Sequence, residues 1–100
     1  MTSLTTEQFN VPPATQIAAS DTTLEVDLAD GRTIRVPLAW YPRLHHATPD
    51  ERQNWQLTGS GQGIHWPDLD EDISIRSIIL GHPSGESQRS LQRWLKQRQA

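Results

Sequence analysis

The sequence predicts a small α+β domain. A short antiparallel β-meander of three strands, with a candidate fourth, packs with short helices, and an amphipathic helix ends the chain. The observations behind this class are apolar–polar alternation around an Asp-Gly turn and short helix signals further along the chain. One hundred residues are enough for one core and too few for two domains. We expect a thin core around Trp40, Trp55 and Trp66.

Three strands are predicted in the first part of the chain. Residues 15–20 are β-permissive, and residues 23–29 alternate apolar with acidic side chains, which is the period of a half-buried strand. Asp30-Gly31 then predicts a hairpin, because glycine tolerates the positive φ of a type I′ turn. Residues 32–38 alternate again. Pro37 keeps this last strand from being central along its whole length, because proline lacks the backbone donor of a ladder.

Short helices are predicted in the middle of the chain. Residues 39–47 favour one or two helical turns, and Thr48-Pro49-Asp50-Glu51 has the form of a capping box that starts a second short helix. Residues 64–66 are the candidate fourth strand, after a glycine-rich turn. Residues 74–80 have the pattern of another short helix, with a glycine as its C-terminal cap.

These elements divide the chain into three parts. Residues 1–14 are polar, end close to two prolines and predict a flexible arm. Residues 15–82 form the predicted α+β domain, and residues 83–100 form a linker and a C-terminal basic amphipathic helix. No apolar run approaches the roughly 18 residues of a membrane-spanning helix. Cysteine and a secretory signal are also absent, so we expect no membrane and a cytoplasmic location.

The distribution of charge predicts a partner-binding site at the C-terminus. Residues 1–83 carry five arginines against eleven acidic residues, whereas residues 84–100 carry four cations against one glutamate. The last helix sets a basic stripe beside an apolar face, which suits docking on a protein partner or on a second copy of the chain. The alternative is a helix that packs on its own domain and leaves its charges in water. The residues predicted to bind the partner are Arg89, Leu91, Arg93, Trp94, Leu95 and Lys96.

The sequence assigns no catalytic residue, no metal ligand and no cofactor. His45-His46 has no accompanying nucleophile with an obvious partner. Residues 68–72 match alternate positions of a calcium loop, but Ile73 and Ile79 stand where that loop needs a glycine and a bidentate glutamate. We prefer the interpretation in which these acidic residues complement the start of the helix at Ser74. A metal-binding protein that uses the acidic loop remains a third option.

Four stretches of the chain carry a family resemblance. They are Leu28-Ala29-Asp30-Gly31-Arg32, Val36-Pro37-Leu38, Tyr41-Pro42-Arg43-Leu44 and Ile64-His65-Trp66-Pro67-Asp68-Leu69-Asp70-Glu71-Asp72-Ile73-Ser74. Together they resemble one bacterial family, the domain-of-unknown-function family 2442. The resemblance covers about residues 15–82 and implies a small α+β domain that opens with a three-stranded meander.

The same resemblance implies two classes of role. Some relatives continue into a helix-turn-helix, and others are similar to the antitoxin partner of a small toxin-like protein. Residues 84–100 offer one helix, whereas a helix-turn-helix needs two. We therefore expect a non-enzymatic binding protein, antitoxin-like in role. The alternative is a nucleic-acid-linked transcriptional regulator that pools its basic tails as an oligomer.

Overall fold

The computed structural model describes residues 10–99. Most of the predicted N-terminal arm, residues 1–9, lies outside the described residues. The described end of the arm is attached to the domain. The carbonyl oxygen of Val11 accepts a hydrogen bond from the Gln62 side chain at 3.0 Å, and that of Pro13 accepts one from the Ala29 backbone at 2.9 Å.

The first sheet is the predicted antiparallel meander, in the order β1-β2-β3. Its strands are β1 (Ala14–Ala19), β2 (Thr23–Leu28) and β3 (Thr33–Pro37). The hairpin between β2 and β3 is confirmed, but its turn is not type I′. Within residues 29–31 of this turn only Gly31 has a positive φ, 96°, and the Leu28 N–H donates to the Arg32 carbonyl at 2.8 Å. These features fit a type I turn closed by a glycine bulge. Pro37 lies on an edge strand, as proline requires.

The predicted fourth strand exists, but it belongs to a second antiparallel sheet in the order β4-β5-β6. Its strands are β4 (Gln56–Thr58), β5 (Gly63–Trp66) and β6 (Glu71–Ser74). β4 and β6 were not predicted. Each has only three or four residues, and β6 contains Glu71 and Asp72, which the sequence placed in a loop. Both strands are held by pairing with β5 rather than by their own composition.

Short helices connect the strands, largely where the sequence predicts them. The capping box is confirmed: the Glu51 carboxylate accepts from the Thr48 backbone at 2.9 Å, and the Thr48 hydroxyl accepts from the Glu51 backbone at 3.2 Å. Ser74 caps the third helix by accepting from the Ser77 backbone at 3.1 Å. The helices are η2 (Leu38–Trp40), α1 (Pro42–His45), α2 (Pro49–Gln53), η3 (Gly59–Gly61), η4 (Pro67–Leu69), α3 (Ile75–Ile79) and α4 (Gln88–Gln99).

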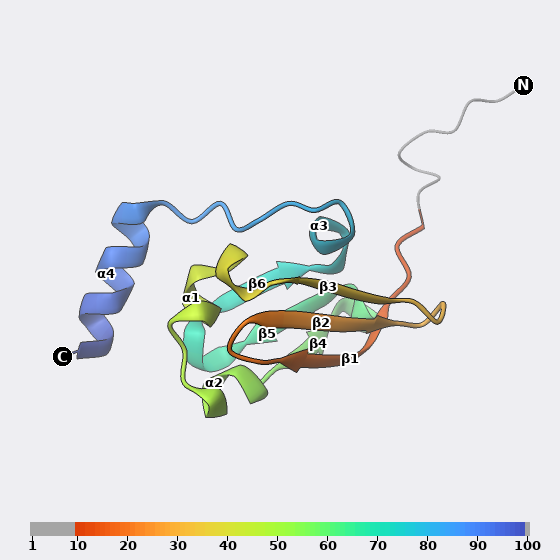
Figure 1. Cartoon of the computed structure of the whole chain (residues 1–100), viewed down its shortest axis with the longest axis horizontal. Helices are drawn as coiled ribbons and strands as arrows, with labels where there is room; N and C mark the ends of the chain where they lie inside the picture. The colour runs from red at the N-terminus through yellow and green to blue at the C-terminus, as the bar shows by residue number, and fades with distance from the viewer. Residues whose placement is uncertain (1–9, 100) are drawn as a thin grey trace, which may run out of the picture.

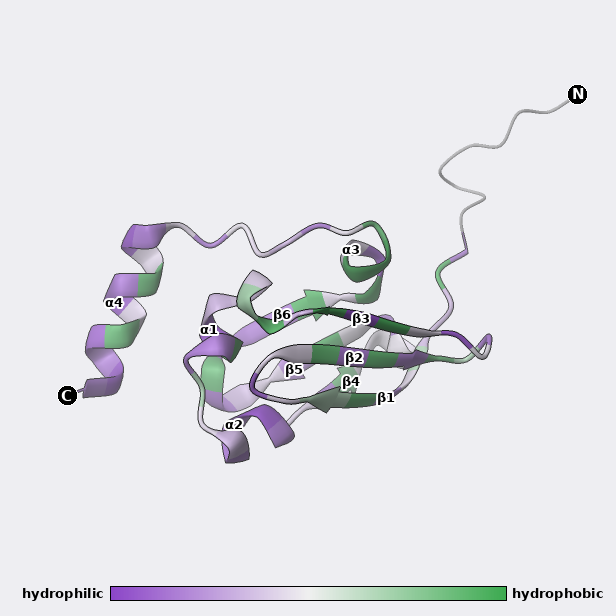
Figure 2. Ribbon diagram, viewed as in Figure 1, coloured by the Kyte–Doolittle hydropathy of each residue, from purple (hydrophilic) through white to green (hydrophobic). Residues whose placement is uncertain are grey.

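Both sheets contribute to one hydrophobic core. Figure 1 shows β1–β3 in front of β4–β6, with α1 and α2 near one end of the sheets and α4 beyond them. In Figure 2 the apolar residues alternate along β2, as a half-buried strand requires. The expected core of three indoles is only partly correct. Trp66 is fully buried, but Trp40 and Trp55 are partly exposed at the edge of an otherwise largely aliphatic core.

Candidate partner-binding site

The C-terminal helix α4 lies at one end of the molecule, joined to α3 by an extended segment (Figure 1). Leu91 and Trp94 are only 6% and 8% exposed and belong to the core cluster, and Leu95 is half-buried. The expectation of an apolar face free for a partner is therefore wrong for this conformation. The open alternative, packing on the helix's own domain, describes the apolar face of α4.

Two guanidinium groups lie over the Trp94 ring. The guanidinium carbon of Arg98, one turn further along α4, is 4.6 Å from the Trp94 ring centroid, and that of Arg43, on α1, is 5.2 Å away. Both distances are within the range of a cation–π interaction. Trp94 also borders a groove of about 280 Å³ that is shared with residues 67–70. The contact with Arg43 therefore joins the Trp94 indole on α4 to α1.

A largely buried ion pair fixes the segment before α4. The Arg43 guanidinium donates to the Glu86 carboxylate, with a shortest distance of 2.7 Å, and the two side chains are only 16% and 9% exposed. The same guanidinium donates to the backbone carbonyls of Leu69 at 3.0 Å and Asp70 at 3.2 Å. The Arg43 hydrogen bonds hold the pKa of Glu86 below its usual value.

A second ion pair holds the far end of α4. Arg98 donates to both carboxylate oxygens of Glu51, at 2.8 and 3.0 Å. This hydrogen bonding is the largest cause of a lowered pKa of Glu51, about 2, and the capping-box bond from the Thr48 backbone acts in the same direction. Glu51 thus joins the start of α2 to the end of α4.

The basic stripe is the part of the predicted site that faces solvent. Arg89, Arg93 and Lys96 are exposed, and none of them forms an ion pair with any residue between 10 and 99. In Figure 2 α4 is mostly hydrophilic, with a few apolar residues. Of the six predicted residues, three therefore offer an accessible surface, and Leu91, Trp94 and Leu95 attach that surface to the domain.

The acidic loop forms a turn and part of a strand. Asp70 has a left-handed backbone with φ of 51°, and the Asp72 carboxylate lies 2.8 Å from Nδ1 of His65 across β5 and β6. Asp68 accepts a hydrogen bond from Asn54 at 3.0 Å. Within residues 10–99 there is no group of three or more His, Asp or Glu side chains placed to hold a metal ion. The cap of α3 is the Ser74 hydroxyl rather than an acidic side chain.

Sequence reasoning missed the arginines that organise this end of the molecule. Arg43 and Glu86 are 43 residues apart, and Arg98 and Glu51 are 47 apart, so no local pattern connects them. Arg52 is 8% exposed and donates to the carbonyls of Leu44 and His45, the last turn of α1. A buried arginine of this kind is satisfied by backbone oxygens, and only the three-dimensional structure shows them.

The two sheets and the short helices make this a small α+β protein. No helix in the described part of the chain is long and apolar enough to cross a membrane. The chain matches the family model described as "Protein of unknown function (DUF2442)" over residues 14–84, and it belongs to that family. The resemblance inferred from the motifs is therefore confirmed. Comparison with curated proteins gives no match.

Two solved structures are similar to the chain. One is the crystal structure of a protein of unknown function from Rhodospirillum rubrum, which is 29% identical, has a TM-score of 0.66, and is matched over 77% of this chain and 95% of that one. The other is the solution NMR structure of an uncharacterized protein from Chromobacterium violaceum, which is 17% identical, has a TM-score of 0.63, and is matched over 86% and 75%. At that identity, the second similarity shows the fold alone.

Proposed function

We propose that the protein is a non-enzymatic binding protein that captures a protein partner with the exposed basic stripe of α4, Arg89, Arg93 and Lys96. The observation that carries the proposal is that these three cations are exposed and unpaired within the described residues, while ion pairs at both ends of the helix hold it in place. A rigid, cationic helix face fits a partner with an acidic surface.

The apolar residues of α4 support this surface rather than forming it. Leu91 and Trp94 are buried against the domain, so a partner can reach the basic stripe without first displacing the helix. Preorganisation of this kind lowers the entropy cost of binding. We propose the antitoxin-like role in this form, with a small toxin-like protein encoded beside this chain as the partner.

Co-expression with the product of the neighbouring gene tests the proposal. We expect the wild-type chain to capture that product, and the triple variant R89Q/R93Q/K96Q to lose most of the capture. Increasing salt should weaken the complex, because exposed charges are screened beyond a Debye length of about 8–10 Å at moderate ionic strength. The variant R32Q/R35Q is the matched control, because it removes exposed cations on and beside β3, away from α4.

Each outcome decides between the alternatives. Capture by the triple variant at wild-type strength would exclude the basic stripe as the binding surface. Failure of the wild-type chain to capture the neighbouring product would contradict the antitoxin-like role. Binding to duplex DNA that the triple variant loses, in place of protein capture, would favour the nucleic-acid-linked regulator.

A further inference from the structure

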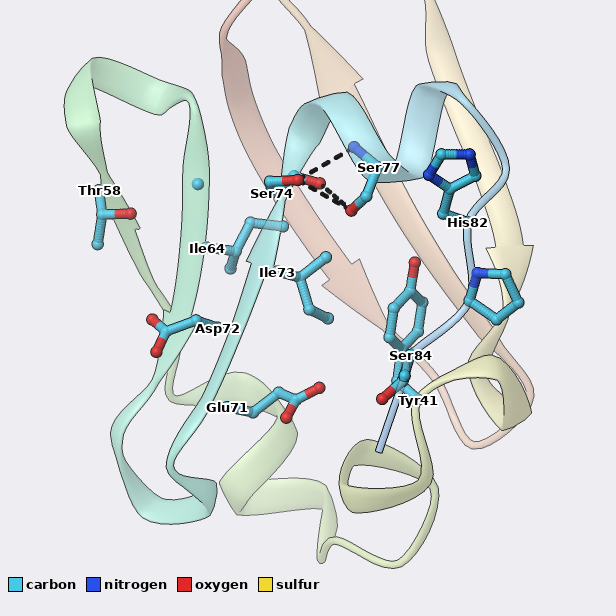
Figure 3. Close-up of a pocket in the computed structure, with 13 residues that line it drawn as sticks. Tyr41, Thr58, Ile64, Glu71, Asp72, Ile73, Ser74, Ser77, His82 and Ser84 are labelled. Atoms are coloured by element: carbon cyan, nitrogen blue, oxygen red, sulfur yellow. Dashed lines mark hydrogen bonds between the residues drawn. The ribbon is translucent and has the colours of Figure 1, made fainter. Parts of the chain in front are cut away.

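A cavity of about 510 Å³ lies between β6, α3 and the segment that follows α3 (Figure 3). It is on a different part of the molecule from the basic stripe, and the function proposed above does not use it. Its walls mix apolar side chains, such as Ile64 and Ile73, with polar groups. The polar groups that matter for its chemistry are Tyr41, Glu71 and His82.

Tyr41 brings an unsatisfied hydroxyl to this cavity. The residue is 2% exposed, and its hydroxyl is buried without a hydrogen-bond partner in the described structure. Burial, followed by the negative charge of Glu71, raises the pKa of Tyr41 to about 12. A buried hydroxyl without a partner is costly, so a bound group that pairs with it is favoured.

Glu71 brings a carboxylate that is also without a partner. Within residues 10–99, the Glu71 side chain forms no hydrogen bond and no ion pair. The neighbouring cation, Arg43, is occupied by Glu86 and two backbone carbonyls. Burial is the main cause that raises the pKa of Glu71 to about 7, against the opposing charge of Arg43.

The charges around the cavity decide the sign of its ligand. Glu71 and Asp72 line it, and Glu86 is close enough to raise the pKa of Glu71 further. An anion would meet these carboxylates, whereas a cation would complete the interactions of Glu71. We propose that the cavity binds a small organic cation with an ammonium or guanidinium group, with the Glu71 carboxylate as its counter-ion and the Tyr41 hydroxyl oxygen as a second acceptor.

The geometry favours an organic cation over a metal ion. Bare metal ions such as Ca²⁺ take six or more oxygen ligands, and no cluster of the required side chains exists in the described part of the chain. The isoleucine walls suit the alkyl part of an amine. Residues 82–85 have no regular secondary structure and line the cavity together with Tyr41. Backbone bonds from His82 to Ser77 at 2.8 Å and from Ser84 to Trp40 at 3.0 Å hold this segment.

An NMR titration of the full chain tests this proposal. The probes are methylguanidinium and n-butylammonium chloride, with N-methylurea as the neutral counterpart and sodium chloride at matched ionic strength. We expect both organic cations to shift the Glu71 carboxyl carbon saturably and to lower the pKa of Glu71, and the two controls to do neither. Glu71→Gln should weaken binding about tenfold or more, because a charge-assisted hydrogen bond is lost. The matched control Glu25→Gln, on β2, should bind like the wild type.

The pH dependence gives a second measurement that does not depend on a variant. Binding should tighten as the pH rises through about 7, because Glu71 then becomes charged. The charged and titratable groups around Glu71 are Arg43 on α1, Tyr41, Asp70, Asp72, Glu86 and His82. The proposal is overturned if the organic cations give no saturable shift, if N-methylurea binds as tightly, or if Glu71→Gln binds like the wild type.

Discussion

Among single residues, Glu71 is a carboxyl group whose environment opposes its charge. It stands at the start of β6, partly buried, with carboxylates nearby and the closest guanidinium already bound to Glu86. Its pKa is therefore raised from 4.5 to about 7, so the native state keeps a proton that the unfolded chain releases at lower pH.

This protonation predicts a pH-dependent stability. The stabilising contribution of the Glu71 proton is complete below about pH 4.5 and is lost as the pH rises through about 7. The side chain of the variant Glu71→Gln is neutral at every pH, so the variant should not show this loss. Its free energy of unfolding should therefore rise relative to that of the wild type as the pH increases across that window. Urea unfolding at a series of pH values measures it, and parallel pH profiles would contradict the expectation.

At the scale of elements, the sequence predicts those structures whose signals lie in consecutive residues. The hairpin at Asp30-Gly31 and the capping box of Thr48 and Glu51 are short-range features, and both are present in the structure. β6 was not predicted because Glu71 and Asp72 have the composition of a loop. Their extended conformation comes from pairing with β5, where Asp72 faces His65.

The candidate site was only partly predictable for the same reason. The i, i+4 and i+7 spacing of Arg89, Arg93 and Lys96 fixes a basic stripe on any helix, and the structure has these three residues exposed. Burial of Trp94 depends on Arg43 and on the loop around Leu69, which are far away in sequence. The local sequence does not distinguish an apolar helix face that packs on its own domain from one that binds a partner.

The turn before β5 supports a prediction about a single glycine. Gly61 has a φ of 89°, and a Cβ atom there would lie 2.8 Å from both the Ala14 carbonyl oxygen and the Pro13 Cβ atom. We expect Gly61→Ala to lower the free energy of unfolding by roughly 1–3 kcal/mol, because backbone strain and a close contact act together. Thermal or urea unfolding measures the loss.

Gly85 provides the matched control for this substitution. Its φ is not in the left-handed region, and a Cβ atom would meet nothing within 4 Å. Gly85→Ala should therefore change the free energy of unfolding by no more than about 0.5 kcal/mol. An equal effect of the two substitutions would mean that neither the positive φ of Gly61 nor the close approach of Pro13 and Ala14 opposes a side chain there.

At the scale of the whole molecule, the segment between α3 and α4 holds the C-terminal helix and also contributes to the stability of the domain. Glu86 lies in this segment, outside the helix, and pairs with Arg43 in a largely buried position. Deletion of residues 84–100 thus removes the basic stripe and also leaves the Arg43 guanidinium with only its two carbonyl partners. Deletion of residues 88–100 removes the stripe, the Ser90 hydrogen bond to Glu86 and the Trp94 contact with Arg43, but it leaves both residues of the ion pair in the chain.

These two deletions should therefore differ in stability although both lack α4. We expect the chain without residues 84–100 to be less stable than the chain without residues 88–100 by roughly 1–3 kcal/mol, because a partly buried charge loses its partner. Glu86→Gln in the longer of the two truncated chains should reproduce much of this loss, which urea unfolding would measure. If all three chains unfold at the same urea concentration, the Arg43–Glu86 pair does not stabilise the domain. Loss of partner capture on deleting residues 84–100 would then come from the missing helix alone, since the domain that remains would be equally stable.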